Sequence, residues 1–147
     1  MKEKNDDAIE SRVRLAVGAA LDKKAFDLNV LSVGELTSIA DFFILASAGN
    51  ERQAAAIADA VQETLREKMK VKPLLVEGTT PGRWILLDYG DFIFHIFTEE
   101  TRRFYGLERL WGDAPNLTAE FTSEFISEFT GEERVEEAPR RALKKTS

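Results

Sequence analysis

Apolar residues recur at helical spacing in two segments of this 147-residue chain. The first predicted helix covers residues 7–24, with Asp6 or Asp7 available as its N-cap. The second begins after Asn50, which lies three residues before Gln53 as in a capping box. The buried stripe predicted for this second helix is Ala54, Ile57, Ala58, Val61, Leu65 and Met69.

Runs of apolar and β-branched residues predict five strands. They lie at 26–33, 41–47, 73–77, 83–88 and 91–97, and a short helix is predicted at 99–109. This order predicts an α/β fold with a mixed sheet of about five strands and flanking helices. The unit from 41 to 77 is expected to form a right-handed parallel crossover, and the last two strands an antiparallel hairpin.

A two-residue loop at Tyr89-Gly90 would set the register of this hairpin. Counting back from it places Asp88 opposite Asp91. The same count places Trp84 opposite His95. One face then mixes an indole, an imidazole and two carboxylates, as a binding surface does, although the spacing alone favours simple packing of a Trp–His pair on the pleated sheet. That face comprises Trp84, Leu86, Asp88, Asp91, Ile93 and His95, and the opposite face, expected to be core, comprises Ile85, Leu87, Phe92 and Phe94.

The segment after the hairpin carries residues that often anchor protein interfaces. Arg102 and Tyr105 are three residues apart and share a face of the predicted helix, which Gly106 loosens or ends. Tyr, Trp and Arg are enriched among the energetically dominant residues of interfaces. Leu107, Leu110 and Trp111 form an apolar ridge that could instead clamp the segment onto the sheet, which is the interpretation we favour for Leu110.

Charge and composition narrow the function classes. The chain has 26 acidic and 20 basic residues, and its net charge of −6 argues against broad binding to nucleic acid but suits a basic protein partner. It has no cysteine and one histidine, which excludes thiolate sites and His–His metal pairs. Without a long apolar run or a signal peptide, a cytoplasmic protein is expected.

Four carboxylates at predicted strand ends keep a nucleotide-handling enzyme open as an alternative. They are Asp41, Glu77, Asp88 and Asp91, but no Asp-x-Asp pair projects from one strand. Ser47, His95 and Asp88 could be written as a nucleophilic triad, yet no Gly-x-Ser-x-Gly elbow supports them.

The last part of the chain differs in pattern from the rest. Leu117, Phe121, Phe125 and Phe129 fall at four-residue steps among acidic residues, which predicts an acidic amphipathic helix that docks on the domain or on a partner. A basic tail ends at Lys145. We therefore expect one domain at 1–113 and an extension at 114–147.

Several short motifs occur in a specific order. They are Asp41-Phe42-Phe43-Ile44, Glu77-Gly78, Trp84-x-x-x-Asp88, Gly90-Asp91, His95-x-Phe97 and Arg102-x-x-Tyr105-x-Leu107-Glu108-x-Leu110-Trp111. Together they resemble the ribosomal silencing factor family, also called Iojap-like, from about residue 7 to 113.

The resemblance implies a fold related to nucleotidyltransferases but without their catalytic carboxylates, no enzymatic activity and no cofactor. It implies binding to the large ribosomal subunit through its ribosomal protein number fourteen. That binding would block joining of the small subunit and repress translation under nutrient limitation. It also implies a possible homodimer.

Within this resemblance we expect Trp84 and Tyr105 to anchor the partner and Arg102 to fix its orientation. Acidic side chains would add charge complementarity. The full set of predicted partner-binding residues is Trp84, Asp88, Asp91, His95, Arg102, Tyr105, Leu107 and Glu108, and no catalytic or metal-binding residue is assigned.

Overall fold

A computed structural model describes residues 2–129 of the chain. Its elements are α1 (Lys2–Asp22), β1 (Phe26–Ser32), β2 (Phe42–Ala48), α2 (Glu51–Met69), β3 (Leu75–Glu77), β4 (Trp84–Asp88), β5 (Phe92–Thr98), α3 (Glu99–Tyr105), α4 (Leu107–Leu110) and α5 (Thr118–Phe129). The five strands form one sheet in the order β1-β2-β5-β4-β3, which confirms the predicted mixed α/β fold.

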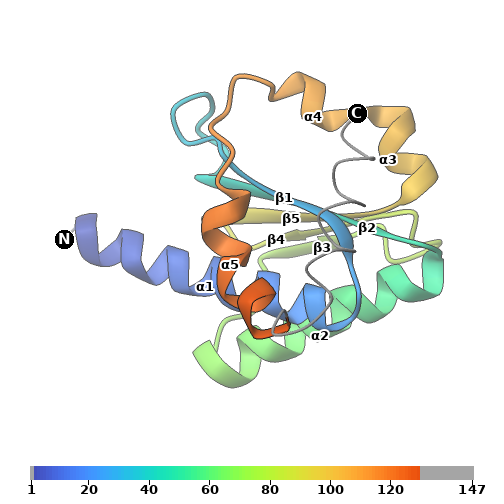
Figure 1. Ribbon diagram of the computed structural model, residues 1–147, viewed down its shortest axis with the longest axis horizontal. Helices are drawn as coiled ribbons and strands as arrows, with labels where there is room; N and C mark the ends of the chain where they lie inside the picture. The colour runs from blue at the N-terminus through green and yellow to red at the C-terminus, as the bar shows by residue number, and fades with distance from the viewer. Residues whose placement is uncertain (1, 130–147) are drawn as a thin grey trace.

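The sheet separates two layers of helices. Figure 1 shows α1 and α2 against one face and α3 and α4 on the other, with α5 beside α1 and β1. The face under α1 and α2 carries the larger core, which includes Ile85, Leu87, Phe92 and Phe94 as predicted. The predicted stripe of α2 is buried from Ala54 to Leu65, and Met69 is half-buried at its end.

Most strand pairs in the sheet are antiparallel. Only β2 and β5 pair in parallel, whereas β1–β2, β5–β4 and β4–β3 are antiparallel. These pairings make β2 and β3 run in the same direction, as the predicted crossover requires. The two strands are not neighbours, because β5 and β4 lie between them.

Local capping decides where the helices begin and end. The Asn50 side chain accepts a hydrogen bond of 2.8 Å from the Gln53 backbone N–H, so the predicted cap of α2 is confirmed. The predicted N-cap at Asp6 or Asp7 is wrong, since α1 already begins at Lys2. The predicted helix at 99–109 is two helices, because Gly106 takes a left-handed conformation (φ 55°) that ends α3.

The predicted hairpin register is wrong by one loop position. The loop is Gly90-Asp91, closed by a 2.9 Å hydrogen bond from the Tyr89 N–H to the Phe92 carbonyl. Gly90 has a φ of 88°, and a positive φ at the first loop residue of a hairpin favours glycine. The observed pairs are Trp84–Phe97, Leu86–His95 and Asp88–Ile93.

This correction leaves the two faces of the hairpin nearly unchanged. Moving the loop by one residue shifts each cross-strand partner by two positions, and side chains two apart lie on the same face. Trp84 and His95 therefore still share a face, which Phe97 joins, whereas Asp91 leaves it for the loop.

The segment after α4 completes the free edge of β1. The Ser32 N–H donates to the Pro115 carbonyl (2.9 Å), and the Leu117 N–H donates to the Val30 carbonyl (2.8 Å). The Thr118 hydroxyl then accepts a hydrogen bond of 3.0 Å from the Val30 N–H. An edge strand that would otherwise present unpaired backbone groups is thus covered.

The predicted amphipathic helix docks on the domain through α5. Phe121 is only 2% exposed and meets the Phe42 ring edge-on, with 5.8 Å between centroids. A Cβ added to Gly18 would lie 2.7 Å from the Phe125 ring, so α1 admits this ring only because residue 18 has no side chain. The predicted basic tail lies outside the described residues.

One core position carries a polar group without a partner among the described residues. The Tyr89 ring stacks on Phe92 (4.9 Å between centroids), and its buried hydroxyl makes no hydrogen bond. Burial raises the pKa of Tyr89 to about 12, so the hydroxyl stays neutral.

Tyr89→Phe is therefore expected to raise the free energy of unfolding by about 1 kcal/mol, because it removes a buried unsatisfied group and keeps the ring. Urea denaturation of both proteins measures the difference. Tyr105→Phe is the matched control, because Tyr105 is exposed and its hydroxyl can reach solvent. A loss of stability in Tyr89→Phe would reveal a hydrogen bond to the hydroxyl, such as one from water.

Candidate functional site: an open face of the sheet

The second face of the sheet is covered on one side only. Residues of α4 and the segment after it pack on β1, β2 and β5, where they close a smaller core. Over β4 and β3, no helix of residues 2–129 provides such a cover: Trp84 and Leu86 are only half-buried, and Leu75 is exposed. Pairing of Leu75 with Asp88 places Leu75 on the same side of the sheet. We call Leu75, Trp84, Leu86 and Tyr105 the open face.

Trp84 is the best-supported side chain of the open face. Its indole Nε1–H donates a 3.1 Å hydrogen bond to His95 Nδ1. Its ring lies 5.0 Å from the Phe97 ring and 4.8 Å from the Tyr105 ring, centroid to centroid. An indole held by a hydrogen bond and two rings is preorganised, so little side-chain entropy is lost when a partner covers it.

His95 lies beneath the open face and accepts the hydrogen bond that holds the Trp84 indole. It is 5% exposed, and Phe43 meets its ring edge-on at 5.1 Å. Because Nδ1 accepts the hydrogen bond from Trp84, the hydrogen-bond pattern assigns the proton of the neutral ring to Nε2. Nε2 is buried without a protein partner among the described residues, and burial lowers the pKa of His95 to about 4. The imidazole is neutral at pH 7.

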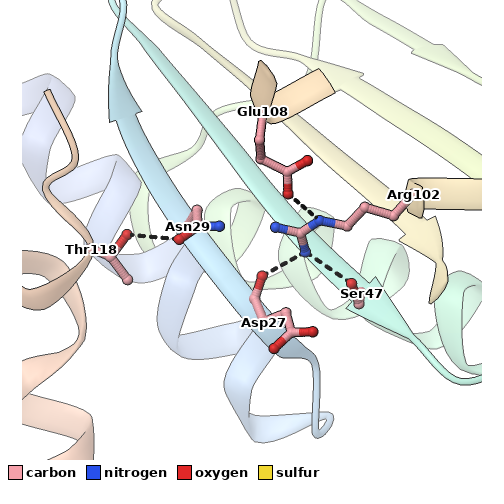
Figure 2. Close-up of polar contacts among 6 residues, drawn as sticks. All are labelled: Asp27, Asn29, Ser47, Arg102, Glu108 and Thr118. Atoms are coloured by element: carbon pink, nitrogen blue, oxygen red, sulfur yellow. Dashed lines mark hydrogen bonds and ion pairs between the residues drawn. The ribbon is translucent and has the colours of Figure 1, made fainter. Parts of the chain in front are cut away.

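Arg102 lies inside the protein, although it was predicted at the partner surface. It is 7% exposed, and its Nε donates a 2.6 Å hydrogen bond to Glu108. Its Nη1 donates to the Asp27 carbonyl and to the Ser47 hydroxyl, as Figure 2 shows. These three partners hold Nε and Nη1 of the guanidinium within the fold.

The predicted acidic residues are separated by the fold. Asp91 forms a 2.8 Å ion pair with Arg12 of α1, the helix on the opposite face of the sheet. Asp88 shares the side of the open face, and its Oδ1 accepts a 2.8 Å hydrogen bond from the Gly90 N–H. Glu108 is partly exposed but holds Arg102.

The ridge after α3 also divides. Leu107 and Trp111 pack on the smaller core, and Trp111 meets the Phe43 ring at 5.0 Å. Leu110, which we expected to clamp the segment onto the sheet, is instead 72% exposed, so that interpretation is wrong. Phe104, at 79% exposure, was missed. The sequence could have indicated this exposure, because Phe104 lies beside Tyr105 in a helix with no apolar stripe.

The arrangement of the carboxylates does not favour catalysis. Asp41 and Asp91 precede their strands and lie together, since the Asp41 N–H donates to the Asp91 carbonyl at 2.8 Å. Ligands of α/β folds bind at the carboxyl ends instead. Across residues 2–129, no three His, Cys, Asp or Glu side chains are grouped to hold a metal. In the same part of the chain, no helix is long and apolar enough to cross a membrane.

The carboxyl ends of β2 and β5 carry an open hollow between the first turns of α2 and α3. It is lined by three arginines (Arg52, Arg83 and Arg103) and by three glutamates (Glu51, Glu99 and Glu100), and two of the arginines form ion pairs. Arg83 lies 3.0 Å from Glu51, and Arg103 lies 3.8 Å from Glu99. The positive charge that a nucleotide phosphate would need is thus already balanced.

Known proteins are similar to this chain in sequence and in fold. A family model described as "Ribosomal silencing factor during starvation" matches residues 5–146. Ribosomal silencing factor RsfS of Halalkalibacterium halodurans is 39% identical over 74% of this chain and 92% of its own length. The Bacillus subtilis protein of the same name is 34% identical over 76% and 94%.

A solved structure agrees with these sequence relatives. The crystal structure of a Chromobacterium violaceum protein matches with a TM-score of 0.68 and 36% identity, over 71% of this chain and 86% of that one. The sequence match covers most of this chain, and the fold agrees with it. The chain therefore belongs to the ribosomal silencing factor family, a family of non-enzymatic ribosome regulators.

Proposed function

We propose that this protein represses translation under nutrient limitation by keeping ribosomal subunits apart. It binds the large ribosomal subunit through ribosomal protein number fourteen and blocks joining of the small subunit. Membership of the ribosomal silencing factor family supports the large subunit as partner. The site of action is the cytoplasm.

The open face is the observation that supports a protein partner most directly. Trp84 stands half-buried and rigid beside Tyr105, which is 53% exposed. Anchors of this kind release most binding energy when the partner excludes water from them. Glu77 is exposed at the edge of the same side of the sheet, paired in register with Leu86.

The charge of the protein favours a basic protein surface over bare RNA. A net charge of −6 is repelled by ribosomal RNA phosphates, so contact with the subunit has to begin on a basic protein. Acidic groups such as Glu77 and Asp88 would speed the encounter and set orientation more than they raise affinity. The apolar side chains would slow dissociation.

The proposed mechanism is steric and involves no chemical reaction. A folded domain that covers part of the joining surface competes sterically with the small subunit. The occupied fraction of large subunits depends on the concentration of the factor relative to its Kd. A homodimer through the open face would use the same side chains, and it would have to dissociate before binding.

Tyr105→Ala is expected to weaken binding to large subunits by about 2 kcal/mol, or roughly 30-fold, because it truncates an exposed interface anchor. Cosedimentation at graded protein concentrations measures the Kd. Arg66→Ala on α2 is the control, because this exposed side chain lies behind the opposite face of the sheet. Equal affinity of Tyr105→Ala and wild type would remove Tyr105 from the interface.

The proposed function itself is tested with the unmodified protein. It is expected to cosediment with large subunits and to slow subunit joining followed by light scattering. A protein that neither cosediments nor slows joining would falsify the proposal. Mass determination by light scattering establishes whether the free protein is a dimer.

A further inference from the structure

A buried charged side chain, Arg102, attaches α3 to the domain, whereas the partly buried Leu107 and Trp111 pack α4 on the smaller core. Within the described part of the chain, Arg102 is the one buried residue of α3, and α4 has none. The neighbouring Phe104 and Tyr105 are exposed. Helices are usually held by a buried apolar face, so α3 depends unusually on one guanidinium.

That guanidinium connects three segments that lie far apart in sequence. Figure 2 shows Arg102 between β1, β2 and α4. Its Nη1 donates to the Asp27 carbonyl (2.5 Å) and to the Ser47 hydroxyl (2.8 Å), and its Nε donates to Glu108 (2.6 Å). Arginine remains charged at all ordinary pH values, so a buried guanidinium is stable only while such partners surround it.

A bulge in β1 provides the acceptor at Asp27. The pairing of β1 with β2 shifts register between Phe26 and Asn29, and Asp27 takes a left-handed φ of 49°. Asp is among the few residues other than glycine that tolerate this region. The result is a backbone carbonyl that leaves the regular ladder and accepts from Arg102.

The position of Tyr105 follows from these contacts. Tyr105 lies between Arg102 and Gly106 in the chain. The Gly106 N–H donates a hydrogen bond of 2.9 Å to the Arg102 carbonyl and closes the turn around Tyr105. Glu108 ties the beginning of α4 back to the same side chain. The Tyr105 ring therefore rests 4.8 Å from Trp84 because α3 and α4 are fixed on both sides of it.

We propose that Arg102 is a positioning residue for partner binding: it holds α3 and α4 on the sheet and so keeps Tyr105 beside Trp84, without touching the partner. The effect of Arg102 on binding rests on the proposed function. The attachment of α3 and α4 to the sheet by Arg102 does not depend on that function. It replaces the expectation that Arg102 contacts the partner directly.

The test combines two substitutions at Arg102 with Tyr105→Ala. Arg102→Met keeps an unbranched apolar stem and removes the guanidinium with its charge and donors. Arg102→Lys keeps the charge but loses the planar group that donates in several directions. Arg103→Met, on the exposed side of the same helix, is the matched control. Arg102→Met is expected to weaken binding to large subunits about 30-fold, whereas in a Tyr105→Ala background it should cost less than about threefold. Arg102→Lys should fall between wild type and Arg102→Met.

Hydrogen exchange provides a readout that does not involve the ribosome. In Arg102→Met, amides of Gly106, Arg109 and Trp111 are expected to exchange on the order of 10-fold faster, while those of β5 stay unchanged. All three amides are hydrogen-bonded within α3 and α4 or at their ends. Should Arg102→Met not fold, Glu108→Gln weakens one contact only and must show the same pattern at smaller amplitude.

Several outcomes would overturn the inference. Equal losses from Arg102→Met in the wild-type and Tyr105→Ala backgrounds would mean that Arg102 acts independently of Tyr105. Unchanged exchange of the three amides would mean that α3 and α4 are held by other contacts. If exchange rises as expected but wild-type protein does not bind subunits, the positioning of α3 and α4 holds and the proposed function fails.

Discussion

Removal of residues 116–147 is expected to lower the free energy of unfolding by about 4 kcal/mol. Full burial of a Phe side chain contributes about 2–3 kcal/mol, and Leu117 and Phe125 add smaller shares because they are only partly buried. Phe121 is 2% exposed, and its removal would uncover Phe42 and the edge of β1. Urea denaturation of the full and shortened chains measures the difference.

The same shortened chain is expected to bind large subunits within about threefold of the full chain, a factor worth less than 1 kcal/mol. In the order β1-β2-β5-β4-β3, α5 and β1 lie at one edge and the open face at the other. The Halalkalibacterium halodurans relative matches over 109 residues that cover 92% of its length, so this relative has a shorter chain than the 147 residues here.

Two full-length variants serve as controls for the truncation. Phe121→Ala is expected to cost about 3 kcal/mol by itself, and Ser123→Ala, at an exposed position of α5, close to nothing. A stable shortened chain that no longer binds subunits would place the C-terminal segment in the partner interface. The proposed division between residues 113 and 114 is tested by the same experiment.

Acid is expected to destabilise the protein through His95. Its pKa in the folded protein is about 4, below the ordinary value of 6.5. The unfolded chain therefore takes up the proton first as the pH falls, and folding stability declines between about pH 6.5 and pH 4. The slope approaches about 1.4 kcal/mol per pH unit, for a total of about 3 kcal/mol. Above pH 6.5 this contribution is constant.

His95→Phe separates this titration from that of the carboxylates. The chain has one histidine, so the variant removes imidazole titration entirely. Its stability at pH 7 is expected to be lower, because the Trp84 Nε1–H loses its acceptor, but the decline between pH 6.5 and 4 should be shallower. Denaturation midpoints at half-unit pH steps measure both slopes. Identical slopes would show that His95 is not the group responsible.

The sequence determined the parts of the fold that depend on neighbouring residues. The stripe of α2, the Asn50 cap and the alternation in β4 and β5 are local patterns, and each appears in the structure. The alternation even survived an error in the register, since a shift of two positions returns every side chain to its own face. The ordered motifs were enough to indicate the family, which the relatives confirm.

Tertiary structure alone decided which of the predicted site residues face outward. Asp91 pairs with Arg12, which is 79 positions away, and the partners of Arg102 include Ser47, 55 positions away. Arginine and aspartate are exposed in most proteins, so no local pattern predicts that they bind partners within their own fold. The order of the strands has the same origin, because β5 and β4 enter between β2 and β3 from later in the chain. Local spacing determines which face a side chain takes, but only long-range contacts determine what covers that face.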